Sequence, residues 1–329
     1  MPTPSTALEA VLERHDDADW RRTAAELQAE THDVDRAAVR IWVAFHPLAL
    51  ARVIEAAADP RALAVRLALE GRYRLADRID TSHAFLFGHR YWPEARRAVL
   101  ALAAAGTAPA GPLGAVVREV AAITAAAAGA DRALVTGIAL VALATLQHVG
   151  REALAAAPGA VTLDPRARRR TAAQVLAARA RDDGQGLFGF LRGERKVWTI
   201  TFDEHDSEGR FPLTHTQAIT TAAAEDRRDW RARDPRCTEG PIPVQCRSAA
   251  CGTCWVGVLG GASNLSPVEP PERRKLAECG YAESRDEHPE IRLACQAKAM
   301  GAVSLVIPPW HGVFGWLVPE AVSTLIGAP

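Results

Sequence analysis

Apolar residues recur at helical spacing through the first half of the chain. Val39, Trp42 and Val43 follow the i, i+3, i+4 pattern of one helix face, and strand-like alternation is scarce. Alanine is frequent throughout this half, which also favours helix. We therefore expect an all-α domain over residues 1–181, with helices at 34–57, 93–105, 113–128, 132–156 and 165–181.

Several local signals indicate where these helices begin and break. Thr6 and Glu9 have the spacing of a capping box, which places the start of a first helix between them. Pro60 and Pro93 suit the first turn of a helix, where proline loses no hydrogen bond. Pro47 lies inside an apolar stretch and predicts a kink or a division there.

A glycine-rich segment at 182–193, DDGQGLFGFLRG, separates this half from a different pattern. Its GxGxxG match follows a predicted helix and precedes a predicted strand, the reverse of the dinucleotide-binding order, so we interpret it as a linker. Alternation then predicts an α+β second domain over 194–309, followed by an apolar tail at 310–329. The expected elements are strands at 196–202, 211–214, 255–259 and 303–307, with helices around 215–229 and 272–279, and regular structure ends at Pro308–Pro309.

Composition and charge exclude several classes of protein. The chain has 329 residues with 39 basic and 39 acidic side chains, and this balance argues against a nucleic-acid partner. The N-terminus lacks the basic start and apolar run of a signal peptide. The longest uncharged apolar run, 133–146, is shorter than the ~20 residues of a membrane-spanning helix. We expect a cytoplasmic protein without a transmembrane segment, or one held at the inner face of the membrane through a partner.

All six cysteines lie between residues 237 and 295, and clustered cytosolic cysteines commonly bind metal or do redox work. Four of them have the spacing C-x4-C-x2-C followed by a distant fourth, which is the plant-type [2Fe–2S] pattern. A zinc site with four thiolates is the alternative, although zinc favours two CxxC pairs and only one is present. Outside this pattern, Cys237 and Cys279 are expected to be free or buried thiols, with redox sensing as the alternative. The four candidate ligands are Cys246, Cys251, Cys254 and Cys295.

The stretches PVQCRSAACGTCWVGVLGG and IRLACQAKAMGAVSLVIP closely resemble a plant-type [2Fe–2S] ferredoxin domain, over about residues 194–309. The resemblance implies a β-grasp fold and a [2Fe–2S] cluster. It places Cys246 and Cys251 on the iron nearer the surface, and Cys254 and Cys295 on the other. Four features depart from the family pattern. Ala249 stands where glycine is usual, the gap before Cys295 is longer than is common with its excess at 279–289, and 203–210 and 227–241 look like insertions.

These observations favour a one-electron carrier rather than an enzyme with its own substrate site. With four thiolates and no histidine ligand, and with Trp255 expected to exclude water, the midpoint potential should be negative. Two alternatives remain: a cytochrome-like protein with haem in the helical half, and a non-redox protein that senses through a cluster or zinc. The haem alternative depends on histidines for which core or capping roles are the simpler interpretation, namely His15, His32, His46, His83, His89 and His148.

Two further stretches, LADRIDTSHAFLFGHRYWPEARRAV and GLFGFLRGERKVWTITF, are similar to iron–sulfur proteins that accompany high-affinity uptake [NiFe] hydrogenases. That resemblance implies protein redox partners, with a hydrogenase as donor and the respiratory chain as acceptor. The apolar tail, WHGVFGWLVPEAVSTLIGAP, is expected to pack on the chain's own helical domain. A partner subunit and peripheral contact with a membrane surface are the alternatives for the tail.

Overall fold

The structure is a computed structural model that describes residues 5–106, 111–181, 196–281 and 287–312. It forms two compact units, one of residues 1–52 and 74–172 and the other of residues 53–73 and 173–329. The expected linker at 182–193 and residues 313–329 of the expected tail lie outside the described ranges. Segments 53–73 and 173–181, which the sequence pattern assigns to the helical domain, instead cluster with the C-terminal unit.

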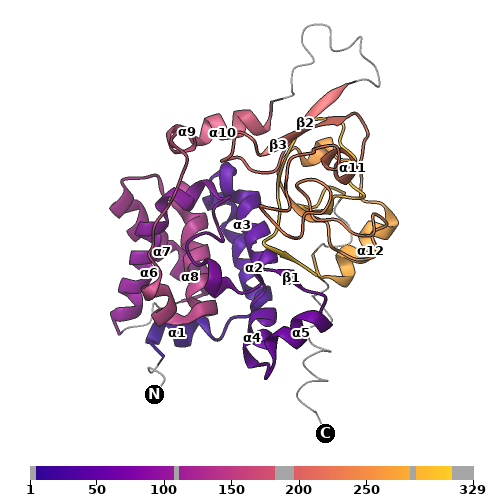
Figure 1. Ribbon diagram of the computed structural model, residues 1–329. Coiled ribbons are helices and arrows are strands. Elements are labelled where there is room, and N and C mark those ends of the chain that lie inside the picture. Colours follow the sequence, from indigo (N-terminus) through magenta and orange to yellow (C-terminus); the bar gives the residue numbers. More distant parts are fainter. Residues whose placement is uncertain (1–4, 107–110, 182–195, 282–286, 313–329) are drawn as a thin grey trace. The chain divides into compact units, whose positions relative to one another are not determined.

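The first unit is helical and is built around one long buried helix (Figure 1). This helix, α8, packs against α6, α7, α3 and α1, and its apolar side chains are almost all buried. The predicted helix at 113–128 is confirmed at those bounds, and the one at 132–156 is confirmed with a kink at Gly150, whose φ of 76° is not helical. The elements of this half are α1 Ala7–Leu12, α2 Asp17–Glu26, η1 Leu27–Glu30, α3 Asp33–Phe45, α4 Leu48–Ala56, η2 Leu75–Arg78, η3 Phe87–Tyr91, α6 Trp92–Ala104, α7 Leu113–Ala128, α8 Arg132–Ala156 and α9 Pro165–Arg169.

The predicted boundary signals act as expected at three places. Thr6 and Glu9 form a capping box, because each side chain accepts a hydrogen bond from the other residue's backbone N–H. Pro60 opens α5, Pro60–Arg66, and Pro93 lies in the first turn of α6. Pro47 lies between α3 and α4 and divides the predicted 34–57 helix.

The predicted single helix at 165–181 is wrong, because the chain leaves helical geometry at Arg170 and forms α9 and then α10, Ala172–Arg179. The physical cause is Arg90. Its guanidinium donates to the carbonyl oxygens of Ala167, Arg168 and Arg170, and its Nη1 lies 3.0 Å from the Arg170 oxygen. These carbonyls therefore have partners without a continuing helix.

The histidines of the helical unit cap helices or fill its core. His32 caps α3, since its Nδ1 accepts the Val34 N–H at 3.2 Å. His83 and His89 meet at 2.9 Å between their Nδ1 atoms, and both are buried. Burial lowers the pKa of His83 well below its usual range, and the neighbouring His89 lowers it further. These positions support the core and capping interpretation.

Two helical stretches are apolar and long enough to cross a membrane, Asp33–Ala56 and Arg132–Ala156. Within the protein, 56% and 67% of their most apolar windows are buried. A buried core helix of a globular protein has the same composition, so this finding is weak evidence for a membrane span.

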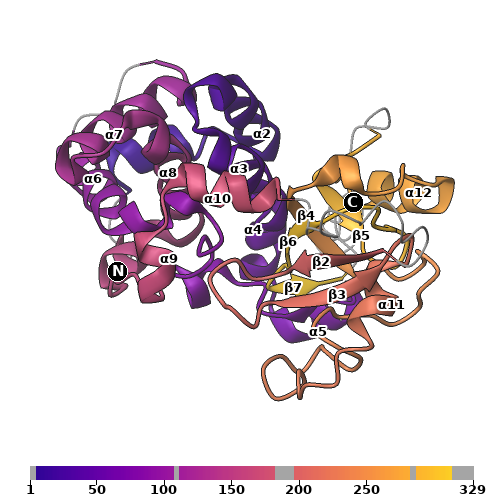
Figure 2. The same cartoon turned by 90° about the horizontal axis from the view of Figure 1, so that it is seen from above.

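The second unit contains a five-stranded mixed sheet with the strand order β3-β2-β6-β4-β5. The first strand, β2, pairs in parallel with the last, β6, and the other pairings are antiparallel. Helix α11 packs beside β3 and α12 beside β5 (Figure 2). The bounds are β2 Val197–Thr201, β3 Arg210–Thr214, α11 Ile219–Ala223, β4 Trp255–Gly260, η5 Ala262–Asn264, α12 Pro270–Glu278, β5 Ile291–Leu293 and β6 Val303–Val306.

This arrangement confirms the α+β fold class, a helical N-terminal region followed by a sheet region. It corrects the predicted helix around 215–229, which is limited to the five residues of α11. Thr216 has a positive φ of 65°, which is incompatible with a helix that starts before it, and Asp226 with Arg228 forms a hydrogen-bonded turn after α11. The three-residue strand β5 is too short to show a period of two in the sequence.

The sequence pattern predicted that regular structure ends at Pro309. The chain instead continues into one strand of a second, two-stranded sheet. β1, Glu70–Gly71, pairs with β7, Trp310–His311, and both belong to the second unit. The His311 Nε2 lies 3.0 Å from a Glu70 carboxylate oxygen, and Trp310 is 2% exposed. The pairing partner comes from residues 53–73, so a local pattern could not predict it. The first residues of the apolar tail, 310–312, thus pack within this unit.

Candidate metal centre

The loop that carries three cysteines has an unusual backbone. Arg247, Ala249 and Gly252 all have positive φ angles, between 55° and 67°. Ala249, which replaces the usual glycine, accepts this geometry at a cost of roughly 1–2 kcal/mol. The resulting turns point N–H groups inward, and those of Ser248 and Cys251 each lie 3.4 Å from the Cys246 sulfur. The loop is therefore shaped to hold a negatively charged sulfur.

The four predicted ligands come together as two pairs of thiols. The Cys251 backbone N–H donates to the Cys246 sulfur at 3.4 Å, and Cys254 and Cys295 lie close enough that each shifts the pKa of the other. The first pair is half-buried, whereas Cys254 is 2% exposed and Cys295 is 9% exposed. In the described part of the chain, no three His, Cys, Asp or Glu side chains are arranged to hold a single metal ion. The pair of Cys246 and Cys251 therefore lies nearer the surface than the pair of Cys254 and Cys295.

One thiol in each pair is poised as a thiolate. Burial raises the pKa of Cys246, but hydrogen bonds from Ser248 and Cys251 outweigh it and lower the pKa to about 6. A hydrogen bond from Cys254 lowers the pKa of Cys295 to about 7. The same contact, together with burial, raises the pKa of Cys254 well above its usual range. Thiolates are the form that binds metal, so the lowered pKa values of Cys246 and Cys295 favour that form at one thiol of each pair.

Cys295 reaches the loop because the sheet carries it there. β5 ends at Leu293, which pairs with Trp255 on β4, and the Ala294 N–H donates to the Cys254 carbonyl at 2.9 Å. The Gln296 amide then donates to the Cys295 sulfur and to the Arg247 carbonyl, each at 3.3 Å. The residues on both sides of Cys295 are thus hydrogen-bonded to the cysteine loop.

A buried ion pair holds β5 in this position. Glu272 of α12 and Arg292 of β5 are both fully buried and form two parallel hydrogen bonds of 2.9 Å. The same carboxylate accepts the Leu293 N–H at 2.7 Å, and Arg292 also donates to the Ser266 carbonyl. Such a pair is strongly destabilising when only one partner is removed. Sequence reasoning missed it, because neither residue lies in a recognisable motif.

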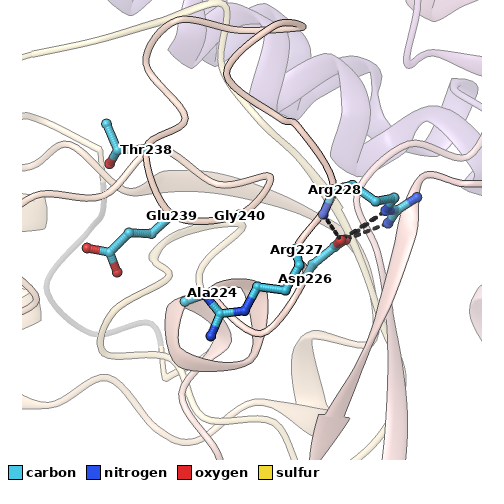
Figure 3. A pocket seen from close by; sticks show the side chains of 7 residues that line it. All are labelled: Ala224, Asp226, Arg227, Arg228, Thr238, Glu239 and Gly240. Atoms are coloured by element: carbon cyan, nitrogen blue, oxygen red, sulfur yellow. Dashed lines mark hydrogen bonds and ion pairs between the residues drawn. The ribbon is translucent and has the colours of Figure 1, made fainter.

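The predicted insertion at 227–241 forms a charged cavity of about 390 Å³ beside the loop (Figure 3). Arg228 folds onto Asp226, while Glu239 lies on another side of the cavity and forms an ion pair with Arg247 of the cysteine loop. The cavity wall is therefore connected to the metal centre. The lining residues are Ala224, Asp226, Arg227, Arg228, Thr238, Glu239 and Gly240.

The two other cysteines are buried thiols, as the sequence predicted, and none of the six forms a disulfide. Cys237 donates to the Pro241 carbonyl at 3.3 Å. Burial and the nearby Asp234 raise the pKa of Cys237 to about 12, which keeps it protonated and unreactive. Cys279 is 2% exposed at the end of α12.

Comparison with known proteins agrees with this geometry. A family model described as a 2Fe-2S iron-sulfur cluster binding domain matches residues 219–300, a range that begins at α11 and includes all four paired cysteines. No solved structure matches the chain. The C-terminal part of the chain is therefore a ferredoxin-type domain. It binds a [2Fe–2S] cluster.

We expect replacement of Glu272 by Ala to destabilise this domain by about 3–5 kcal/mol, because it leaves the Arg292 guanidinium buried without its carboxylate. Urea unfolding of the full chain, followed by tryptophan fluorescence, measures the loss. The control is Glu278→Ala, which removes a 58% exposed partner of Lys275 and should cost about 1 kcal/mol or less. Equal effects of the two substitutions would contradict the role of the buried pair.

Proposed function

We propose that Cys246, Cys251, Cys254 and Cys295 hold the [2Fe–2S] cluster, and that the chain is a one-electron carrier between protein redox partners. The observation that supports this most strongly is the meeting of the four thiols as two pairs inside the range of the matched family model. Each iron of such a cluster needs two protein thiolates, and each pair provides them.

Different residues of the chain would have different roles in such a carrier. Backbone N–H groups of Ser248 and Cys251 stabilise negative charge at the Cys246 sulfur, which is half-buried and so accessible to a partner. On the inner side, Cys254 and the buried Trp255 separate the site from water. When bound, a [2Fe–2S] cluster takes up or releases one electron. Burial of the inner pair disfavours added negative charge, so we propose a negative midpoint potential.

For the partners, we propose that an uptake [NiFe] hydrogenase is the donor and the respiratory chain the acceptor, with the carrier in the cytoplasm or at the inner face of the membrane. The support is the resemblance of residues 75–99 and 186–202 to iron–sulfur proteins that accompany such hydrogenases. Phe87 and Gly88 lie within 75–99, and their N–H groups donate to the buried Asp35 carboxylate, each at 2.7 Å. The stretch is thus a fixed part of the helical unit, as a docking surface requires.

Replacement of any one of the four motif cysteines by Ser should weaken or abolish the visible absorption of the purified protein, because each is proposed to be a ligand. The matched controls are Cys237→Ser and Cys279→Ser, which change a buried thiol outside the two pairs. Iron content and absorption are measured for all six variants. Retained absorption in Cys295→Ser together with loss in Cys237→Ser would overturn the ligand assignment.

With the uptake hydrogenase of the same organism and H2, we expect the oxidised protein to become reduced, as seen by bleaching of its visible absorption. The control is the Cys251→Ser variant, which should accept no electrons. A second control replaces the hydrogenase by dithionite. Reduction by dithionite without reduction by hydrogenase and H2 would exclude this donor while leaving the carrier function intact.

A further inference from the structure

Trp255 is held rigidly next to the metal centre. It follows Cys254 directly, begins β4 and is 1% exposed. The ring of the half-buried Tyr281 packs against its indole edge-on, with 4.8 Å between the ring centroids and an interplanar angle of 71°. Its backbone pairs with Leu293, two residues before Cys295. The indole therefore has a fixed orientation relative to both ligand-bearing segments.

The indole N–H of Trp255 is a buried donor that no protein acceptor satisfies. Buried tryptophan N–H groups normally find an acceptor, and an unsatisfied one requires an explanation. Among the described residues, the Trp230 indole nitrogen also lacks a partner, but four other indoles have one. The Trp20 N–H donates to Gln147, that of Trp42 to Ser82, that of Trp92 to Asp80 and that of Trp198 to His215.

The nitrogen edge of this indole faces the cysteine loop. A Cβ atom placed on Gly252 would lie 3.1 Å from the Trp255 Nε1 and 3.6 Å from its Cε2. Gly252 has a φ of 67° and stands between Cys251 and Cys254. The absence of a side chain at 252 thus leaves the N–H directed at the segment that connects one thiol pair to the other.

We propose that the Trp255 indole N–H donates a hydrogen bond to a sulfur of the metal centre and thereby raises its reduction potential; this rests on the proposed function. The proposed acceptor is a negatively charged sulfur atom of the filled site, which the loop beside the indole would hold. Reduction adds negative charge at the centre, so the hydrogen bond is stronger in the reduced state and favours it.

The sign of the effect separates this role from simple exclusion of water. Replacement of Trp255 by Phe removes the N–H and also leaves a smaller ring. Loss of a hydrogen bond lowers the midpoint potential, whereas entry of water would stabilise the added charge and raise it. We expect a decrease of about 59 mV, which corresponds to a tenfold change in the ratio of reduced to oxidised protein for one electron.

The test is a redox titration of full-length Trp255→Phe, monitored by the EPR signal of the reduced protein. The matched control is Trp198→Phe on β2. This substitution removes an indole N–H that donates to His215 Nδ1 at 3.1 Å. It should leave the midpoint unchanged. An unchanged or higher midpoint in Trp255→Phe overturns the proposal, whereas absence of a [2Fe–2S] EPR signal from the wild-type protein overturns the proposed function instead.

A second measurement is made on the wild-type protein, so it does not depend on whether Trp255→Phe folds. Wild-type protein labelled with ¹⁵N at the indole nitrogen of tryptophan should show a ¹⁵N hyperfine coupling in pulsed EPR of the reduced state, transmitted through the hydrogen bond. The coupling should persist in Trp198→Phe. Its absence from the wild-type spectrum contradicts the proposal.

Discussion

The structure depends on one constraint: a cysteine separated from the third by 40 residues must reach the same point as the other three. The nine-residue cysteine loop carries three of the four thiols, so the fourth must come from elsewhere in the chain. The β4–β5 pairing and the Ala294–Cys254 hydrogen bond bring Cys295 there. The buried pair of Glu272 and Arg292 keeps β5 from shifting. If these four cysteines hold the cluster as proposed, its binding and the folding of this domain are coupled, as in metal sites formed by distant ligands.

The same constraint explains the asymmetry of the site. The loop thiols Cys246 and Cys251 lie at the surface because the loop is an excursion from the sheet, while Cys254 and Cys295 lie at strand ends and are buried. In the proposed carrier, an electron would enter or leave through the half-buried pair, which lies nearer the surface. The buried pair, with Trp255 behind it, sets the environment that determines the potential. Access for a redox partner and control of the reduction potential would thus depend on different thiol pairs.

Much of this could be predicted from sequence, because it depends on local patterns. The cysteine spacing, the capping box at Thr6 and the helices at 113–128 and 132–156 are all encoded within short windows. What could not be predicted depends on distant partners. Arg90 ends a helix by binding carbonyls near residue 170, and β1 exists only because β7 pairs with it. The unsatisfied N–H of Trp255 is visible only once the loop has been placed around it.

The central claim is that four paired thiols hold a two-iron cluster. The most direct measurement is the iron, zinc and acid-labile sulfide content of the protein purified without oxygen, together with its Mössbauer spectrum. The account predicts two iron and two sulfide per chain, and after one-electron reduction one ferric and one ferrous site. Stoichiometric zinc without iron would contradict it.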